Sequence, residues 1–468
     1  MKFKINVLVF FCVINFALAD EAIITNSPNV DLVSTTSSYI SKSAYTQNPY
    51  VNLTSLGGTQ IVTESQLKRD SIAQKWFSDG TWNAAGVATY YNQNNATNFA
   101  YAANIFAQTG YVNGFAFGTF LTIANPISLG INPSATINQA QDIPINYTVN
   151  PQELYVEYQY NNIVQVDAGW IGINNVPWLT YYKNYSLNLM TYQGLAVNVN
   201  PGRGWLLTAL AFNGSQIIGE TGFSQLTLYN QNAVFNQFGL TNLNSNQGSP
   251  GTIAFGSTWS AYNQNLNIRL WCYQFYDYAN LAYADSSLKL PLNNDLSFTL
   301  AAQLAEEQPN GNDVLQTSGY GSASSNAVGL QFGLNYKILG LQLSYNNITG
   351  PSNAYASGDI VSPYTFLYAN DPLYTTGYIN GLIELASGNA YKIAPTISLL
   401  DNNLQINPSY EYFATTYIPA SSEYDLQIIY TIQQLKGLFL FGDLSYLQQA
   451  PGMEENSYQA QIYLSYLY

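Results

Sequence analysis

In stretches of this sequence that alternate apolar and polar side chains, several charged residues occupy the polar positions. Lys337, for example, lies between Tyr336 and Ile338. Alternate residues of a β-strand point to opposite faces, so a charge in this position lies on the face opposite the apolar one. Side chains there can attract or repel ions and polar solutes. The bases in this pattern are Arg269, Lys289, Lys337 and Lys392, and the acids are Glu157, Asp167, Glu411 and Asp425.

Residue types that catalysis commonly requires are missing from the chain. It has no histidine, which removes Ser-His-Asp and Cys-His hydrolases and zinc sites built on imidazole. It has neither a GxGxxG motif nor a GxxxxGKS/T motif. Glu306 and Glu307 are adjacent carboxylates, but neighbouring residues of a strand point apart and cannot share a reaction centre. We therefore expect no enzymatic activity, no cofactor and no metal site.

The first residues, MKFKINVLVFFCVINFALAD, have the order of a secretory signal peptide. Lys2 and Lys4 are followed by an apolar run and by small residues that end at Ala19. The apolar run is too short to span a bilayer. We predict a cleaved signal peptide over 1–19 and export of the chain. Cys272 is then the single cysteine of the mature chain, which excludes an internal disulfide.

The mature chain is acidic and poor in charge. Only 9% of the residues are charged, against about 25% in a typical globular domain. The 47% hydrophobic content and the 40 tyrosines exclude disorder. Loss of the two signal-peptide lysines changes the net charge from −14 to −16, which excludes nucleic acid as a partner and favours cations. No apolar stretch after the signal approaches the ~18 residues of a spanning helix.

A transmembrane β-barrel explains this composition. Backbone groups inside a bilayer must be paired within the protein, so spanning strands close into a barrel whose residues alternate between lipid and lumen. We predict an all-β, antiparallel transmembrane barrel over 81–468, with about 18 strands (roughly 16–20), in the outer membrane of a Gram-negative bacterium. Alternating segments lie at 83–92, 98–108, 113–125, 152–162, 163–174, 189–199, 203–213, 252–262, 265–290, 295–304, 328–338, 341–346, 377–387, 390–400, 404–412, 424–432, 437–447 and 458–468. The segment 265–290 has the length of one long strand or of two.

Short periplasmic turns and long extracellular loops are expected to join these strands. Long connections occur at 126–150, 214–250 and 349–376, and loops of this length are usually functional or disordered. We expect one or two of them to fold inward and narrow the lumen. Residues 20–80 are rich in Ser, Thr and Asn and are predicted to form a polar periplasmic or plug segment. Within them, QLKRDSIAQKWF (66–77) has the pattern of a short amphipathic helix, but a plain linker is the favoured interpretation.

Two stretches carry a family resemblance. They are RLWCYQFYDYANLAYADSSLKLPLNNDLSFTLAAQ (269–303) and NDPLYTTGY (370–378). Together with the strands DLSFTLAAQL and AVGLQFGLNYK, they resemble the OprD-like family of outer-membrane porins, most clearly over 265–385. The resemblance implies a barrel of about 18 strands, as a monomer or a loosely associated trimer, that admits small solutes by diffusion through an eyelet. It also implies that inward loops frame this eyelet and that they correspond to 126–150 and 349–376.

The resemblance also implies a ladder of basic residues beside the eyelet. Arg269 matches an arginine that precedes the tryptophan motif, and Lys289 and Lys337 fall on strands where ladder residues can lie. Asp359 and Asp371, in the third long connection, are eyelet candidates. The whole chain has only 13 Lys and Arg residues against 27 Asp and Glu residues, so the ladder is thin. This departure favours neutral or cationic solutes over anionic ones.

We predict passive diffusion of small hydrophilic solutes and ions through an outer-membrane channel with mild cation selectivity, which pore width and charges at the constriction would set. Outer-membrane lipid is the expected surrounding partner. The alternative is a surface-exposed adhesin or structural barrel whose polar, aromatic loops, such as SPYTFLY (362–368), bind another protein. A channel for hydrophobic solutes would need an apolar lumen, and the Gln, Ser and Thr residues of the inward face argue against it.

Overall fold

The computed structural model describes most of the chain beyond residue 75. The described residues are 76–77, 79–93, 96–127, 147–173, 176–180, 189–217, 222–230, 247–262, 264–366, 370–417, 420–432, 435, 437–448 and 456–467. The predicted signal peptide, nearly all of the 20–80 segment and most of the 126–150 connection lie outside them.

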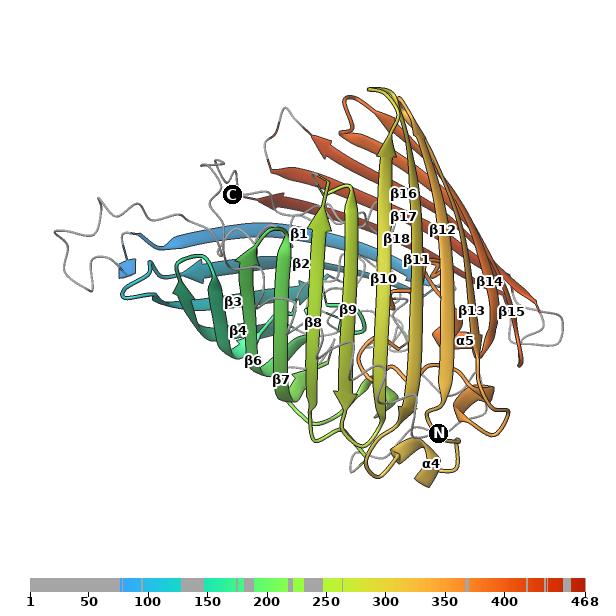
Figure 1. The fold of residues 1–468 in the computed structure, drawn as a ribbon. Helices are drawn as coiled ribbons and strands as arrows, with labels where there is room; N and C mark the ends of the chain where they lie inside the picture. Colours follow the sequence, from blue (N-terminus) through green and yellow to red (C-terminus); the bar gives the residue numbers. More distant parts are fainter. Residues whose placement is uncertain are drawn as a thin grey trace.

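The described strands form one antiparallel sheet of 18 strands that closes on itself (Figure 1). Each strand pairs with the strands before and after it in the sequence, and β1 pairs with β18. The strands are β1 (Thr81–Gln93), β2 (Ala96–Gln108), β3 (Phe115–Pro126), β4 (Thr148–Tyr160), β5 (Val164–Ile171), β6 (Thr191–Gly202), β7 (Trp205–Gln216), β8 (Thr252–Ala261), β9 (Leu266–Phe275), β10 (Ala279–Pro291), β11 (Leu296–Pro309), β12 (Ser325–Tyr336), β13 (Leu339–Thr349), β14 (Gly388–Leu399), β15 (Leu404–Thr415), β16 (Ser421–Ile432), β17 (Leu438–Gln448) and β18 (Ser457–Leu467).

Closure depends on the pairing of the first and last strands. Their register runs from Ala85 opposite Leu467 to Gln93 opposite Gln459. This pairing satisfies the backbone groups that would otherwise form two open sheet edges, which a bilayer does not tolerate. The alternating residues of β18 therefore form the strand that closes the barrel against β1.

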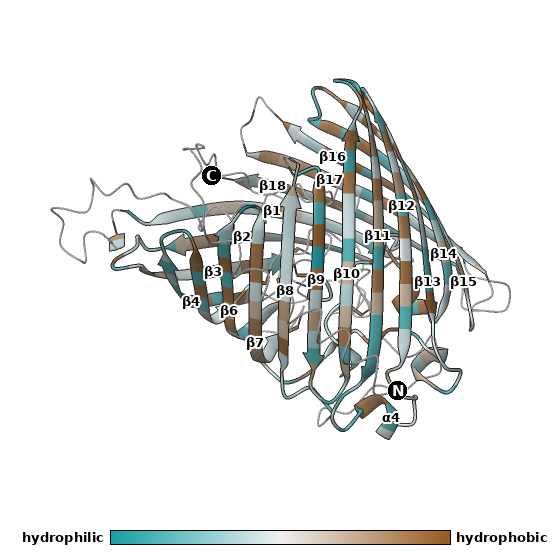
Figure 2. Ribbon diagram, viewed as in Figure 1, coloured by the Kyte–Doolittle hydropathy of each residue, from teal (hydrophilic) through white to brown (hydrophobic). Residues whose placement is uncertain are grey.

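Side chains alternate between a lipid-facing and an inward face along the strands. Leu304, Leu330 and Leu444 are among the exposed apolar residues of the outer face, and Figure 2 shows apolar and polar residues following one another along the strands. Their sequence neighbours point inward, where most are buried or half-buried. Large apolar residues are thus exposed on the outside of the barrel and polar residues lie inside, as in other membrane barrels.

Tyrosines form a band on the outer face of β13 to β18. Tyr345 lies opposite Tyr391 in the register, and Tyr391 lies opposite Tyr412. The band continues through Tyr410, Tyr424, Tyr446 and Tyr458, and the rings of Tyr410 and Tyr424 lie 5.0 Å apart. Tyrosine suits the level of the lipid headgroups because its ring is apolar and its hydroxyl is polar. The band marks one membrane interface.

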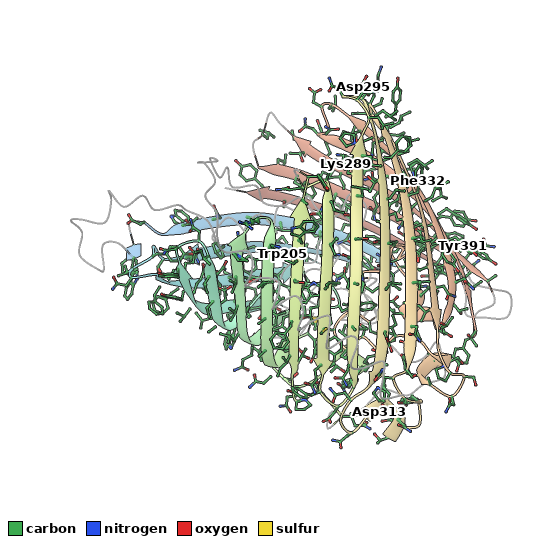
Figure 3. All side chains as sticks on the ribbon, viewed as in Figure 1. Trp205, Lys289, Asp295, Asp313, Phe332 and Tyr391 are labelled. Carbon is green, nitrogen blue, oxygen red and sulfur yellow. The ribbon has the colours of Figure 1, made fainter. Side chains whose placement is uncertain are left out.

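The connections differ in length at the two ends of the barrel. Short turns join strands at one end, for example 337–338 between β12 and β13, whereas longer connections lie at the other end. Figure 3 places Asp295, in a short turn, at one end and Asp313, beside helix α4 (Val314–Thr317), at the opposite end. Short turns are periplasmic in such barrels. The long connections, and the tyrosine band near them, are therefore extracellular.

Segment 265–290, which the sequence leaves as one long strand or two, is two strands, β9 and β10, joined by a short turn. The predicted strand set needs two corrections. Segment 377–387 is no strand; it belongs to the connection between β13 and β14 and contains helix α5 (Leu382–Leu385). The turn after β12 lies at Lys337–Ile338 and not at 339–340. A periodicity of two cannot reveal these differences, because apolar loop residues that pack inside a barrel look like strand residues.

Among the described residues, the long connections also contain the short helices η3 (Leu228–Asn230) and η5 (Tyr355–Ser357). Within the described ranges, no helix has the length and apolarity needed to cross a membrane.

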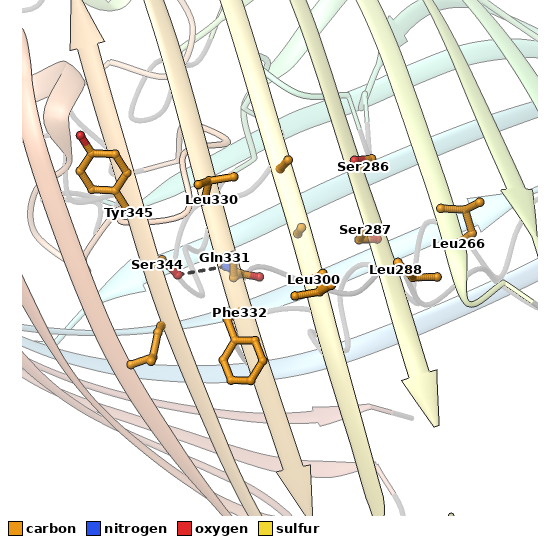
Figure 4. Close-up of a pocket in the computed structure, with 13 residues that line it drawn as sticks. Leu266, Ser286, Ser287, Leu288, Leu300, Leu330, Gln331, Phe332, Ser344 and Tyr345 are labelled. Atoms are coloured by element: carbon orange, nitrogen blue, oxygen red, sulfur yellow. Dashed lines mark hydrogen bonds between the residues drawn. The ribbon is translucent and has the colours of Figure 1, made fainter. Parts of the chain in front are cut away.

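A groove of about 690 Å³ lies on the outer face over β9 to β13 (Figure 4). Leu300, Leu330 and Phe332 are outward side chains at its walls, and the small Ser286 and Ala302 lie between them. Gln331 and Ser344, which are hydrogen-bonded to each other at 3.2 Å, belong to the inward face of the same strands. The groove faces lipid, so it is not part of a passage through the barrel.

Candidate functional site: the barrel lumen and its inward segment

One long connection lies inside the barrel. We call residues 350–366 and 370–387, between β13 and β14, the inward segment. Its side chains Ile360, Val361, Phe366 and Leu382 are fully buried. The prediction that 349–376 turns inward agrees with this burial, and the inward part continues as far as residue 387.

The first half of the inward segment contacts β11 and η3. The backbone N–H of Val361 donates to Glu307 Oε2 at 2.8 Å, and the N–H of Ser362 donates to the Tyr229 hydroxyl at 3.0 Å. The rings of Tyr229 and Phe366 stack with centroids 4.6 Å apart. Glu307 thus acts as a fixed acceptor on the wall, although Glu306, its neighbour, points to the other face.

The second half of the inward segment contacts β13, β14 and β16. Thr375 N–H donates to Asn346 Oδ1 at 3.1 Å. The Lys392 ammonium donates to the carbonyl oxygen of Thr376 at 2.8 Å. Beyond Thr376, the backbone meets the carboxylate of Glu423. The segment therefore spans the lumen, with polar anchors on walls that are distant in the sequence.

The predicted inward position of Arg269 is correct, and the side chain is paired there. Its Nε atom donates to Asp285 Oδ1 at 2.8 Å, and its Nη2 atom donates to Asp285 Oδ2. Arg269 lies directly opposite Asp285 in the register of β9 and β10. The Tyr283 hydroxyl also donates to Asp285 Oδ2, at 2.8 Å. A bidentate contact of this kind uses the fork of the guanidinium and neutralises both partners.

Lys392 and Glu411 form a second ion pair on the inward face. Their Nζ–Oε1 distance is 2.7 Å, and their side chains are 6% and 0% exposed. The two residues are opposite each other in β14 and β15. Asp425, on β16, is bridged to Glu411 by the Ser409 hydroxyl, which lies 2.7 Å from Glu411 Oε1 and 3.3 Å from Asp425 Oδ2. The structure thus brings three of the sequence-predicted charges together.

Glu157 and Asp167 lie side by side on another part of the wall. They are directly opposite in β4 and β5. Glu157 is buried and accepts hydrogen bonds from Gln108 Nε2 at 2.7 Å and from the Tyr111 hydroxyl at 2.6 Å. Gln165 Nε2 donates to Asp167 Oδ2 at 3.0 Å. Both carboxylates therefore accept hydrogen bonds from uncharged polar side chains, and none of these contacts comes from a base.

Lys289 and Lys337 occupy the turn end of the barrel. Lys289 is exposed near the end of β10 (Figure 3). Lys337 was expected on a strand face, but it lies in the turn after β12 with φ of 51°. Its ammonium is 4.0 Å from Asp295 Oδ2, and both side chains are more than half exposed. Lys337 is therefore not part of the inward wall, because the strand ends one residue before it.

Asp359 and Asp371 lie in the inward segment, and both are buried there. Asp371 Oδ1 accepts from Leu373 N–H and from the Thr376 hydroxyl, each at 2.8 Å, so this carboxylate shapes a turn of the segment. Burial raises the pKa of the Asp359 carboxyl well above its usual value, and the nearby Glu384 carboxylate acts in the same direction. Neither carboxylate is presented to water as an exposed filter charge.

Several acids of the inward face were missed by the sequence analysis. They are Glu153, Asp285, Glu307, Glu423 and Asp443. The signal was available for Asp285, Glu423 and Asp443, because each lies at the same parity as a predicted inward residue of its own or a neighbouring strand. Their hydrogen-bond partners were not predictable, since they come from segments far away in the sequence.

The lumen therefore has a surplus of acids. Both ion-paired bases of the inward strand face, Arg269 and Lys392, are held by carboxylates, and further carboxylates lie on the same face. In the part of the chain that the structure describes, no group of three or more Asp, Glu or Cys side chains is arranged to hold a metal ion.

Comparisons with known proteins agree with the fold. Residues 171–371 match the model of the OprD family of outer-membrane porins. The crystal structure of Pseudomonas aeruginosa OpdK with vanillate is similar at a TM-score of 0.66 and 15% identity, covering 84% of this chain and 99% of that one. Acinetobacter baumannii OccAB3 gives 0.68 and 13%, covering 84% and 100%. Pseudomonas aeruginosa OprD gives 0.64 and 12%, covering 88% and 99%. None of the curated proteins matches the chain.

The closed barrel, its apolar outer face and its polar inward face define a transmembrane β-barrel of the bacterial outer membrane. The comparisons add that residues 171–371 resemble the OprD family of outer-membrane porins and that the chain shares the fold of the OpdK, OccAB3 and OprD structures.

Proposed function

We propose that this barrel is a passive channel that prefers small cationic and neutral hydrophilic solutes to anionic ones. The observation that carries the proposal is the pairing of two buried bases of the inward face. Arg269 and Lys392 are each bound to a carboxylate, so they offer little attraction to an anion. Charge at the narrow part of a pore, together with its width, sets the selectivity.

The acids that are not paired with a base give the lumen a net negative charge. Glu157 and Asp167 face each other across β4 and β5, and Glu423 and Asp425 lie on β16. Fields in a narrow, low-dielectric cleft are focused and act over several ångströms, so buried carboxylates contribute even where water does not touch them. A cation entering the lumen is attracted, and an anion is repelled.

The proposal differs from what one similar structure displays. OpdK was solved with vanillate, which carries a carboxylate. In the present chain the corresponding chemistry would need free bases in the lumen. Among the residues that the structure describes, Lys289 is an exposed base on the inward face, near the periplasmic end of β10. We therefore expect anionic aromatic acids to be poor solutes for this channel.

Vesicle swelling tests the proposal. Purified protein in liposomes should admit arginine and neutral small sugars faster than glutamate or gluconate of similar size. Protein-free liposomes give the background rate. Faster entry of the anionic solutes would show that the paired bases still govern selectivity, and the proposal would be wrong.

A further inference from the structure

We infer that Glu423 is the positioning residue that holds the inward segment in place and thereby sets the width of the passage. The inference rests on the channel function proposed above. Glu423 lies on β16, on the inward face, and is fully buried. It had no part in the predicted set of selectivity residues.

The carboxylate of Glu423 binds three consecutive backbone N–H groups of the inward segment. Tyr378 N–H donates to Oε1 at 2.6 Å, Ile379 N–H donates to the same oxygen, and Asn380 N–H donates to Oε2 at 3.0 Å. Tyr378 N–H is also 3.2 Å from Asp425 Oδ2. Successive N–H groups that converge on one point form an anion-binding concavity, and hydrogen bonds to a charged acceptor are roughly twice as strong as neutral ones.

The local sequence of the segment fits this contact. A Cβ atom at Gly377 would lie 2.7 Å from Glu423 Cδ and 2.7 and 2.8 Å from its oxygens, so only glycine admits the carboxylate. A Cβ atom at Gly381 would lie 2.9 Å from both Asp371 Oδ2 and Glu384 Oε2. The two glycines are thus required by close approach and not by their backbone angles. They frame the turn that presents the three N–H groups.

Further contacts fix the same turn from its other sides. Lys392 donates to Thr376 O, immediately before Gly377, and Tyr378 donates through its hydroxyl to Gln461 on β18. The residues from Thr376 to Asn380 are therefore connected to β14, β16 and β18. Among these contacts, Glu423 alone takes hydrogen bonds from three residues of the segment.

The position of Glu423 in the wall supports a specific role for its charge. It lies opposite Glu411 in the register and two residues from Asp425 on the same face. A third carboxylate is unfavourable at such a place unless donors compensate it. The backbone N–H groups of the segment supply those donors. Segment and carboxylate therefore stabilise each other, and loss of either partner frees the turn.

The test compares three variants with the unmodified protein. Glu423→Gln keeps the shape but replaces one acceptor oxygen with an NH₂ group, which repels the N–H donors. Gly377→Ala leaves every charge unchanged and forces the carboxylate away. Glu306→Gln is the matched control, because its carboxylate is on the outward parity of β11 and accepts a hydrogen bond from Gln308 of the same strand. Heat-modifiable migration on gels verifies that each variant has a folded barrel.

Two measurements then separate the possible outcomes. In liposome swelling with neutral sugars of increasing size, Glu423→Gln and Gly377→Ala should admit larger sugars several-fold faster, and Glu306→Gln should behave as the unmodified protein. In chymotrypsin digestion of the folded barrel, both variants should be cut after Tyr374 or Tyr378 several-fold faster. Unchanged protease resistance of both folded variants would overturn the inference, even in a preparation that conducts nothing. A lack of conduction in the unmodified protein would instead contradict the channel function.

Discussion

Replacement of Lys392 by Met is the most informative single change in the lumen. Met is of similar length and unbranched, but it carries no charge. Lys392 is paired with Glu411 at 2.7 Å, and both side chains are almost fully buried. Without the ammonium, the Glu411 carboxylate would face Glu423 and Asp425 with no positive partner. Removing one member of a buried pair typically costs about 3–5 kcal/mol, because it leaves an uncompensated buried charge.

We expect Lys392→Met to lower the unfolding free energy of the barrel by that amount. Urea titrations in detergent micelles, followed by tryptophan fluorescence, measure this free energy from the midpoint and the slope. Glu411→Gln alone and the double variant complete a cycle. The double variant should be clearly more stable than Lys392→Met, because the orphaned charge is gone. A loss of less than about 0.5 kcal/mol for Lys392→Met, the range of ordinary surface substitutions, would refute this reasoning.

Three other changes have defined outcomes. Arg269→Gln should free the Asp285 carboxylate and move the reversal potential in a salt gradient further toward the cation value; a shift in the anion direction would contradict the pairing argument. Burial raises the pKa of Asp359, so the folded chain binds more protons than the unfolded chain between the usual and the raised pKa. The unfolding free energy should therefore fall as pH rises between these two pKa values. Asp359→Asn should flatten this pH dependence in urea titrations, and the same pH dependence in the variant would contradict the role of Asp359. Gly256→Ala would place a Cβ atom 2.4 Å from the Trp271 ring and should lower the unfolding free energy by about 1–3 kcal/mol, whereas an unchanged midpoint would show that the ring can move.

The wall of the barrel was predictable from the sequence because it depends on local rules. Alternation with a period of two identifies a strand and its lipid face, as for Leu404 and Ile406, and a polar lumen follows from the opposite parity. The terminal strand was recognisable for the same reason. The predicted strand number of about 18 left 265–290 open as one strand or two, and it included a false strand at 377–387.

The interior could not be predicted in the same way because it depends on contacts between distant residues. Nothing local shows that Val361 meets Glu307, or that the turn after Gly377 meets Glu423. The pairing of Arg269 with Asp285 required the register of β9 and β10. Without that register, the sequence predicts that Arg269 is a free base of a ladder. Lys337 was wrongly predicted to lie on a strand face. The strand ends one residue before it, so its side chain lies in a turn.

Reconstitution in a planar bilayer tests the central claim most directly. That claim is a water-filled barrel whose lumen carries surplus negative charge. The purified protein should give discrete conductance steps, and in a tenfold KCl gradient its reversal potential should lie on the potassium side of zero. A folded barrel that stays silent, or one whose reversal potential lies on the chloride side, would contradict the account.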